Sequence, residues 1–331
     1  DPGGLAFHTI SVSPRATVEA WFYFTALQGL FLAVSTIPDN QRSRAASIFI
    51  ATALLLGVEG LWQSRSAHPF DLYGRIPVDS PQGLETSTFG PFHNRNHFAT
   101  ITALAAAVAF AWAFRLGREA GGARRLLGNA QILSRVVLLV GLAAFLALAT
   151  AASGSRSGTL AVVCALGLVM VRSLRGRSAL VAMLALVLGL VSAGPFVLER
   201  MANFDFTASR LGPWQDMARV VRFFPLFGSG IGAFAASYWP YQGVVTYELW
   251  EHAHNEYLEW LVDAGVVGIL VLGVTFRRLT RGVMLEPGFQ DAAMAALVVV
   301  GVQATLDFPL RIPSGAGMLV ALLAVSTRAR T

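Results

Sequence analysis

Apolar residues occur along this chain in long blocks that short polar segments separate. A helix that crosses a bilayer needs about 20 consecutive, mostly apolar residues. Nine blocks approach this length, and we predict a membrane span for each of them: 17–37, 45–64, 97–114, 136–152, 157–171, 178–198, 255–276, 291–306 and 313–327. The pattern therefore predicts an all-α, polytopic helical membrane protein whose residues 1–331 form one membrane domain.

The composition excludes the other broad classes. Of the 331 residues, 55% are hydrophobic and only 13% are charged, whereas a soluble domain has about 25% charged residues. The net charge of +6 comes from arginine, because the chain contains no lysine. There is accordingly no lysine for a Schiff base or for a nucleotide-binding P-loop. The positive charge follows the pattern of a membrane topology, so we expect membrane lipids as neighbours and no nucleic acid as a partner.

Arginine is concentrated in alternate segments between the predicted spans. Fifteen arginines lie in five such segments together with only four acidic residues. Short arginine-rich loops stay in the cytoplasm, and a nine-span arrangement puts all five on that side and Asp1 outside. The outer side then receives the long polar loops 65–96 and 199–254. The second is too long for a simple connector, and we expect it to be functional.

The segment that begins at His254 leads into the seventh predicted span. On a continuous helix, His254 shares one face with Gly265 and Gly268, whose lack of side chains permits close helix packing. The acidic residues of the segment fall on the opposite face, where we expect a solvated or arginine-paired surface: Glu256, Glu259 and Asp263. Histidine is a natural general base near neutral pH. The spacing also leaves open a capping or interfacial role for His254.

Arg156 is the only charged residue between Arg135 and Arg172. An unpaired arginine at membrane depth costs on the order of 3 kcal/mol or more. We therefore expect it to have an acidic side chain or a bound phosphate as its partner, the alternative being a plain anchor at the end of a loop.

Loop 199–254 contains a helical stretch that reaches Phe224, with Trp214 and Met217 on its apolar face. It resembles a helix that lies in the membrane interface. In that position it would bring three arginines to the level of anionic lipid phosphates: Arg210, Arg219 and Arg222. A surface helix with a purely structural role is the alternative. The glycine-rich run 228–232 that follows predicts a tight turn, because its spacing is wrong for a dinucleotide site.

His93 and His97 have the i, i+4 spacing of metal ligands, but no convincing third ligand is present. We therefore expect no metal and no cofactor. A loop-to-helix junction with Asn96 as the helix N-cap is the better interpretation.

Taken with its spacing, the sequence from His254 through Gly265 to Gly268 resembles the His-x10-Gly-x2-Gly signature of the O-antigen ligase and polymerase superfamily. Four other stretches agree with that superfamily in their order along the chain: Thr88–Ala99, Ser153–Gly158, Arg210–Gly232 and Leu306–Pro309.

This resemblance implies a GT-C-like membrane glycosyltransferase of the bacterial inner membrane. Such an enzyme takes a glycan from undecaprenyl diphosphate at the periplasmic face, without a metal. The resemblance implies that His254 is catalytic and that Arg156 and Arg210 bind diphosphate, with Arg219 or Arg222 attracting the substrate. Because family members usually have more than nine membrane helices, we expect further helices before residue 1.

Other readings of the residues remain open. The resemblance does not separate a ligase from a polymerase, and the acceptor is a glycan, a lipid such as the lipid A core, or a protein. Arginines and acidic residues near the fourth, fifth and seventh spans are also compatible with a membrane transporter or anion carrier. A structural subunit of an envelope assembly is a third possibility.

Overall fold

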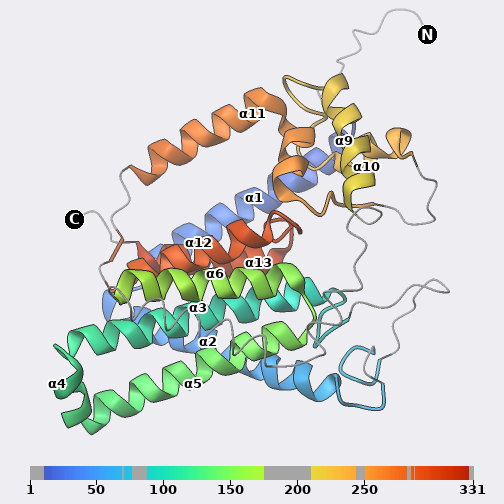
Figure 1. Ribbon diagram of the computed structural model, residues 1–331. Coiled ribbons are helices and arrows are strands. Elements are labelled where there is room, and N and C mark those ends of the chain that lie inside the picture. Colours follow the sequence, from blue (N-terminus) through green and yellow to red (C-terminus); the bar gives the residue numbers. More distant parts are fainter. Residues whose placement is uncertain are drawn as a thin grey trace, which may run out of the picture. The chain divides into compact units, whose positions relative to one another are not determined.

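The computed structural model describes residues 11–68, 71–76, 88–174, 210–243, 250–281, 285–286 and 288–327. Apart from isolated β-bridges, the regular secondary structure of these residues is helical (Figure 1). Six helices are long and apolar enough to cross a membrane: α1 (Pro14–Ser35), α2 (Asp39–Gln63), α3 (Arg95–Glu119), α5 (Ala130–Ala152), α6 (Arg156–Ser173) and α11 (Glu256–Thr280). The expectation of a polytopic helical membrane protein is confirmed.

The remaining three predicted spans have different outcomes. Helices α12 (Gln290–Gln303) and α13 (Pro313–Ser326) are apolar, but each has only 14 residues. At 1.5 Å per residue each is about 21 Å long, which is less than the roughly 30 Å of a bilayer's hydrocarbon core. The predicted span 178–198 lies outside the described residues.

The chain divides into two compact units, each built from segments that are distant in the sequence. We call Asp1–Gly29, Asp205–Val283 and Ala304–Phe308 the histidine unit, because it contains His254. The other segments, Leu30–Phe204, Met284–Gln303 and Pro309–Thr331, form the bundle unit. That residues 1–331 make up a single membrane domain stays a prediction.

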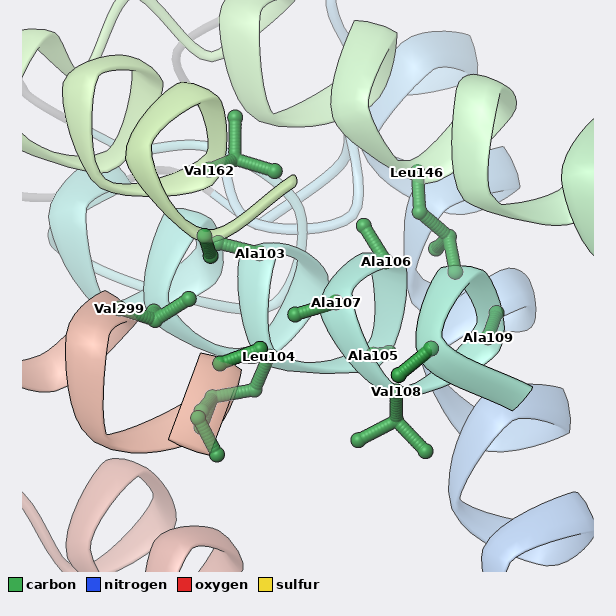
Figure 2. Close-up of a cluster of buried hydrophobic side chains, with 14 of the residues drawn as sticks. Ala103, Leu104, Ala105, Ala106, Ala107, Val108, Ala109, Leu146, Val162 and Val299 are labelled. Atoms are coloured by element: carbon green, nitrogen blue, oxygen red, sulfur yellow. The ribbon is translucent and has the colours of Figure 1, made fainter. Parts of the chain in front are cut away.

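Helix α3 lies at the centre of the bundle unit and packs against α2, α5, α6, α12 and α13. Most of its buried side chains are alanine. Figure 2 shows this alanine surface with Leu146 of α5, Val162 of α6 and Val299 of α12 beside it. Small side chains let neighbouring helix backbones approach closely, so the alanines of α3 explain how five helices surround it.

Buried hydroxyl and amide groups add polar contacts to this apolar packing. The hydroxyls of Thr102 in α3 and Thr150 in α5 are 2.8 Å apart. Thr100 donates to the side-chain oxygen of Gln303 in α12 at 2.9 Å, and the Gln303 amide donates to the backbone oxygen of Asn96 at 3.0 Å. These bonds fix the register of α3 against α5 and α12.

The arginine-rich helix ends of the bundle unit are tied together by ionic contacts. Asp291, at the start of α12, accepts hydrogen bonds from Arg118 of α3 at 2.6 Å and from Arg172 of α6 at 2.8 Å. Arg42 of α2 donates to backbone oxygens near the C-terminal end of α13. The arrangement agrees with a common side for these arginines, and which side faces the cytoplasm stays a prediction.

Asparagine and serine side chains cap the first turns of several helices, among them α3, α6 and α11. Asn94 caps α3 by accepting a hydrogen bond from the Asn96 N–H at 2.8 Å, so the prediction of Asn96 as the cap was wrong. Ser155 caps α6, and Asn255 caps α11 by accepting from the Leu258 N–H at 3.0 Å. Such caps satisfy N–H groups that have no partner inside the helix.

Candidate functional site

A break in helix α11 organises the histidine unit. Gly265 has φ 62° and ψ −174°, far from helical values, although the residues before and after it are helical. The turn that follows helix α9 (Gly212–Phe223) runs past this break, and four backbone hydrogen bonds of 2.8–3.0 Å join the two: Ser229 N to Val262 O, Gly230 N to Asp263 O, Val266 N to Pro225 O, and Val267 N to Leu226 O. The prediction of one continuous helical face from His254 to Gly268 was therefore wrong at Gly265.

Two glycines are required where the turn meets the break. A Cβ on Gly265 would lie 2.5 Å from both the backbone nitrogen of Gly228 and the backbone oxygen of Leu226. A Cβ on Gly228 would lie 2.3 Å from the backbone oxygen of Asp263. Both glycines also have positive φ, which other residues rarely adopt. The glycine-rich run 228–232 and Gly265 of the His-x10-Gly pattern thus belong to two segments whose backbones are in close contact.

The acidic residues of α11 are buried, so the expectation of a solvated face was wrong. Glu256, Glu259 and Asp263 are each at most 1% exposed. Asp263 accepts a hydrogen bond from the Gly232 N–H at 2.8 Å, and Glu256 accepts one from the indole N–H of Trp260 at 3.1 Å. A buried carboxylate without such partners would be costly. The bond of Asp263 ties the glycine-rich turn to α11, whereas the bond of Glu256 lies within the helix.

His254 lies directly before the N-cap of α11 in an unusual backbone conformation. Its φ is 48°, in the left-handed region that a non-glycine residue seldom occupies. The imidazole ring meets Trp250 edge-on at 5.6 Å and Phe308 edge-on at 5.0 Å between ring centroids. Residues held in such conformations cluster at functional sites. The side chain is 27% exposed, so the ring is packed and still accessible.

Asp307 approaches this histidine from the segment between α12 and α13. Its Oδ1 lies 3.6 Å from Nδ1 of His254, and its side chain is only 1% exposed. The backbone oxygen of Asp307 accepts a hydrogen bond from the Glu256 N–H at 3.2 Å, which fixes Asp307 at the start of α11. Among the described residues, neither carboxylate oxygen of Asp307 has a hydrogen-bond partner. The 3.6 Å separation is longer than a hydrogen bond, and contacts of this kind often shorten when substrate binds.

Sequence reasoning missed this pairing. In the sequence, Asp307 belongs to the Leu306–Pro309 stretch, its neighbour Arg311 is the simplest ion-pair partner, and 53 positions separate it from His254. The structure brings the two together because the N–H of Glu256 also bonds the backbone oxygen of Ala304 at 2.9 Å. The sequence signal for this pairing was the order of the stretches shared with the superfamily. That order says nothing about the distance between the side chains of His254 and Asp307.

Helix α9 places two of the predicted arginines, and Arg210 lies just before it. Arg219 and Arg222 are both exposed, and Arg219 forms an ion pair with Asp216 at 3.3 Å. The indole N–H of Trp214 donates to the backbone oxygen of Ala253 at 2.9 Å, which ties α9 to the residue before His254.

The apolar side of α9 packs within the histidine unit. Met217 and Val220 are fully buried against Phe234 and Tyr238 of helix α10 (Phe234–Tyr238). Burial, with a smaller effect of the negative charge of Asp216, raises the pKa of Tyr238 to about 12. Packing against α10 accounts for the apolar face of α9 without any contact with lipid. That α9 lies at the membrane surface stays a prediction.

Arg156 belongs to the bundle unit, where it is the first residue of α6. It is half-buried and follows the capping residue Ser155, which accepts a hydrogen bond from the Gly158 N–H at 3.2 Å. Its role in binding diphosphate stays a prediction. Within the described residues, no group of three or more histidine, cysteine or acidic side chains is arranged to hold a metal ion.

Comparison with protein families gives one match that bears on this site. Residues 141–273 match the family described as O-antigen ligase, which is a family of membrane glycosyltransferases. The resemblance inferred from the sequence is confirmed over this range, which contains Arg156, Arg210 and His254 and ends before Asp307. A comparison with curated proteins found no match.

Proposed function

Because residues 141–273 match the O-antigen ligase family, we propose that the protein transfers a glycan from undecaprenyl diphosphate to an acceptor hydroxyl, by ligation or polymerisation. The reaction takes place at the periplasmic face of the bacterial inner membrane and needs no metal. The observation that carries this proposal is the strained, accessible His254 with the buried carboxylate of Asp307 at its Nδ1.

His254 is the general base of this reaction. Its Nδ1 is buried beside Asp307 and the side chain is 27% exposed, so we assign the contact with the acceptor to the other ring nitrogen, Nε2. The acceptor hydroxyl gives its proton to Nε2 as its oxygen bonds to the anomeric carbon of the donor sugar. Asp307 accepts from Nδ1–H and stabilises the positive charge that the ring gains, as a carboxylate does for the histidine of a catalytic triad.

Arginines bind the diphosphate, whose negative charge grows as its bond to the anomeric carbon breaks. A guanidinium group stays charged and forms paired hydrogen bonds to phosphate oxygens. We assign this role to Arg156 and Arg210, with Arg219 and Arg222 attracting the donor. Arg219 already shares its charge with Asp216, so we expect Arg222 to contribute more than Arg219.

The isoprenoid tail of the donor stays in the membrane. After the break at Gly265, α11 exposes a run of large apolar side chains that suits contact with lipid: Val266, Ile269, Leu270, Val271, Leu272, Val274 and Phe276. The break therefore lies between the polar segment that carries His254 and an apolar helix suited to lipid.

The test is glycan transfer by the full chain in lipid nanodiscs, with the undecaprenyl-diphosphate-linked glycan from membranes of the source bacterium as donor. We expect His254→Ala to lower the transfer rate roughly 10²- to 10⁴-fold. His68→Ala is the matched control, because His68 is 68% exposed and lies in the other unit. We expect Arg222→Gln to raise the donor KM more than Arg219→Gln does.

Two results would overturn the proposal. One is full transfer activity in a well-expressed His254→Ala protein. The other is solute uptake into liposomes, lost on changing His254 or Arg156, by a protein that transfers no glycan, which would assign the chain to transport instead.

A further inference from the structure

A second histidine–carboxylate pair lies next to the first in the histidine unit. Nδ1 of His252 is 2.8 Å from Oε1 of Glu259, a side chain that is 1% exposed. The other oxygen of Glu259 accepts a hydrogen bond from the Ala253 N–H at 2.9 Å. Glu259 therefore fixes both the ring of His252 and the backbone between His252 and His254.

Both histidine rings pack on the same phenylalanine. The His252 ring stacks on Phe308 with centroids 4.1 Å apart and planes at 25°, while the His254 ring meets it edge-on at 5.0 Å. Phe308 is itself only 6% exposed and follows Asp307 directly. One buried ring thus sets the spacing of the two imidazoles, each of which is 27% exposed.

The contact with Glu259 decides which nitrogen of His252 faces a ligand as an acceptor. A carboxylate accepts hydrogen bonds, so the proton of the neutral ring is on Nδ1 and the lone pair is on Nε2. A lone pair receives a hydroxyl hydrogen, whereas a phosphate has only acceptor oxygens to offer. His252 is therefore suited to a hydroxyl group of the acceptor and poorly suited to the donor's diphosphate.

We infer that His252 and His254 together bind two neighbouring hydroxyls of a sugar acceptor, His254 taking the proton of the reacting one and His252 holding the one beside it. This inference rests on the proposed function and adds the substrate class, because a serine or threonine side chain offers only one hydroxyl. It favours a glycan, including the sugar part of a lipid, over a protein as the acceptor.

Two substitutions separate a substrate contact from a structural role. In His252→Asn the side-chain amide nitrogen replaces Nδ1 and keeps the bond to Glu259, but Nε2 is lost. In His252→Gln the amide reaches the position of Nε2, and the bond to Glu259 is lost. If His252 acts only through its bond to Glu259, the asparagine variant retains the acceptor affinity of the wild type, whatever the loss of the ring stacked on Phe308 costs in stability. If His252 holds the acceptor, the asparagine variant loses acceptor affinity and the glutamine variant retains more of it.

The experiment measures equilibrium binding and transfer with the full chain in nanodiscs. The probes are a terminal disaccharide from each candidate acceptor glycan, the lipid-linked glycan and the lipid A core of the source bacterium, with analogues that lack the hydroxyl beside the reacting one, and a serine-containing peptide. We expect His252→Asn to weaken disaccharide binding about three- to tenfold, the value of one hydrogen bond, with the donor KM unchanged. The missing hydroxyl should weaken binding to the wild type and have no further effect on His252→Asn.

Unchanged disaccharide affinity in His252→Asn, a persisting penalty for the missing hydroxyl in that variant, or tighter binding of the peptide than of the disaccharide would each refute the inference. The proposed function fails separately, if the wild type binds the disaccharide and the donor but transfers nothing.

Discussion

Helices α3 and α11 have the same length, 25 residues, and the structure uses them in opposite ways. Helix α3 is regular, surrounded by other helices and buried mainly through alanine. Helix α11 is broken at Gly265, buries three acidic side chains before the break, and exposes large apolar residues after it.

Helices α3 and α11 differ in the strained backbone conformations and the buried polar groups that surround them. In α3 the buried polar contacts are single hydrogen bonds between neighbouring helices, such as that of Thr102 with Thr150. Around α11 they are carboxylates that hold loops, and the positive φ of His254 and Gly265 lies beside them. A helix that only packs tolerates simple side chains, whereas a segment that presents a reactive group needs partners that fix it.

Among substitutions that test the difference between α3 and α11, we expect Gly265→Ala to have the largest effect on stability. The new methyl group would meet the backbone of Leu226 and Gly228 at 2.5 Å, and the residue would keep a strained φ. We expect a loss of roughly 3 kcal/mol or more in the free energy of unfolding, measured by denaturation in detergent.

Gly273→Ala is the matched control in the same helix, because nothing lies within 4 Å of a Cβ at that position. We expect it to be neutral or slightly stabilising, since alanine favours a helix. Equal stability of the two variants would show that α11 is not broken at Gly265.

A smaller effect is expected in α3. Thr102→Val removes one side of the hydroxyl pair with Thr150 and should cost about 1 kcal/mol in the free energy of unfolding. The double change of Thr102 and Thr150 to valine should cost less than the sum of the single changes, because the contact between the two hydroxyls is lost only once. Additive costs in thermal denaturation would contradict the contact.

The smallest effect concerns Tyr238 in the histidine unit. Its pKa is raised to about 12, mainly by burial, so its neutral form is favoured in the folded protein. The stability that it contributes is fully present below the ordinary tyrosine pKa near 10. That stability is lost as the pH rises through about 12. We expect Tyr238→Phe to remove the last-titrating component from the ultraviolet titration of tyrosinate, and an unchanged titration curve would refute this.

The pattern of hydrophobic residues was sufficient to predict most of the helices. Blocks of apolar residues predicted the six long helices, and they also predicted membrane spans at α12 and α13, which are helical but have only 14 residues each. The break at Gly265 was missed for a physical reason. A glycine in an apolar run is equally compatible with close packing of a continuous helix and with a break in the helix. Only the position of Gly228 against Gly265 distinguishes these alternatives.

The site was predictable in part. His254 stood out through its spacing to Gly265 and Gly268. Asp307 was not predicted as its neighbour, nor was the role of Glu259 as the partner of His252. Side-chain periodicity assigns a residue to a face of a helix, but it does not say what covers that face. The acidic residues therefore looked solvated until the segments around α11 were known.

The central claim is that His254 and Asp307 act as one chemical unit, and a double-mutant cycle on glycan transfer tests it most directly. We expect Asp307→Ala and His254→Ala each to reduce transfer strongly, and the double variant to be no slower than His254→Ala alone, because a carboxylate that acts through the ring has no effect once the ring is gone. If the two losses instead multiply in the double variant, Asp307 works independently of His254 and the account is contradicted.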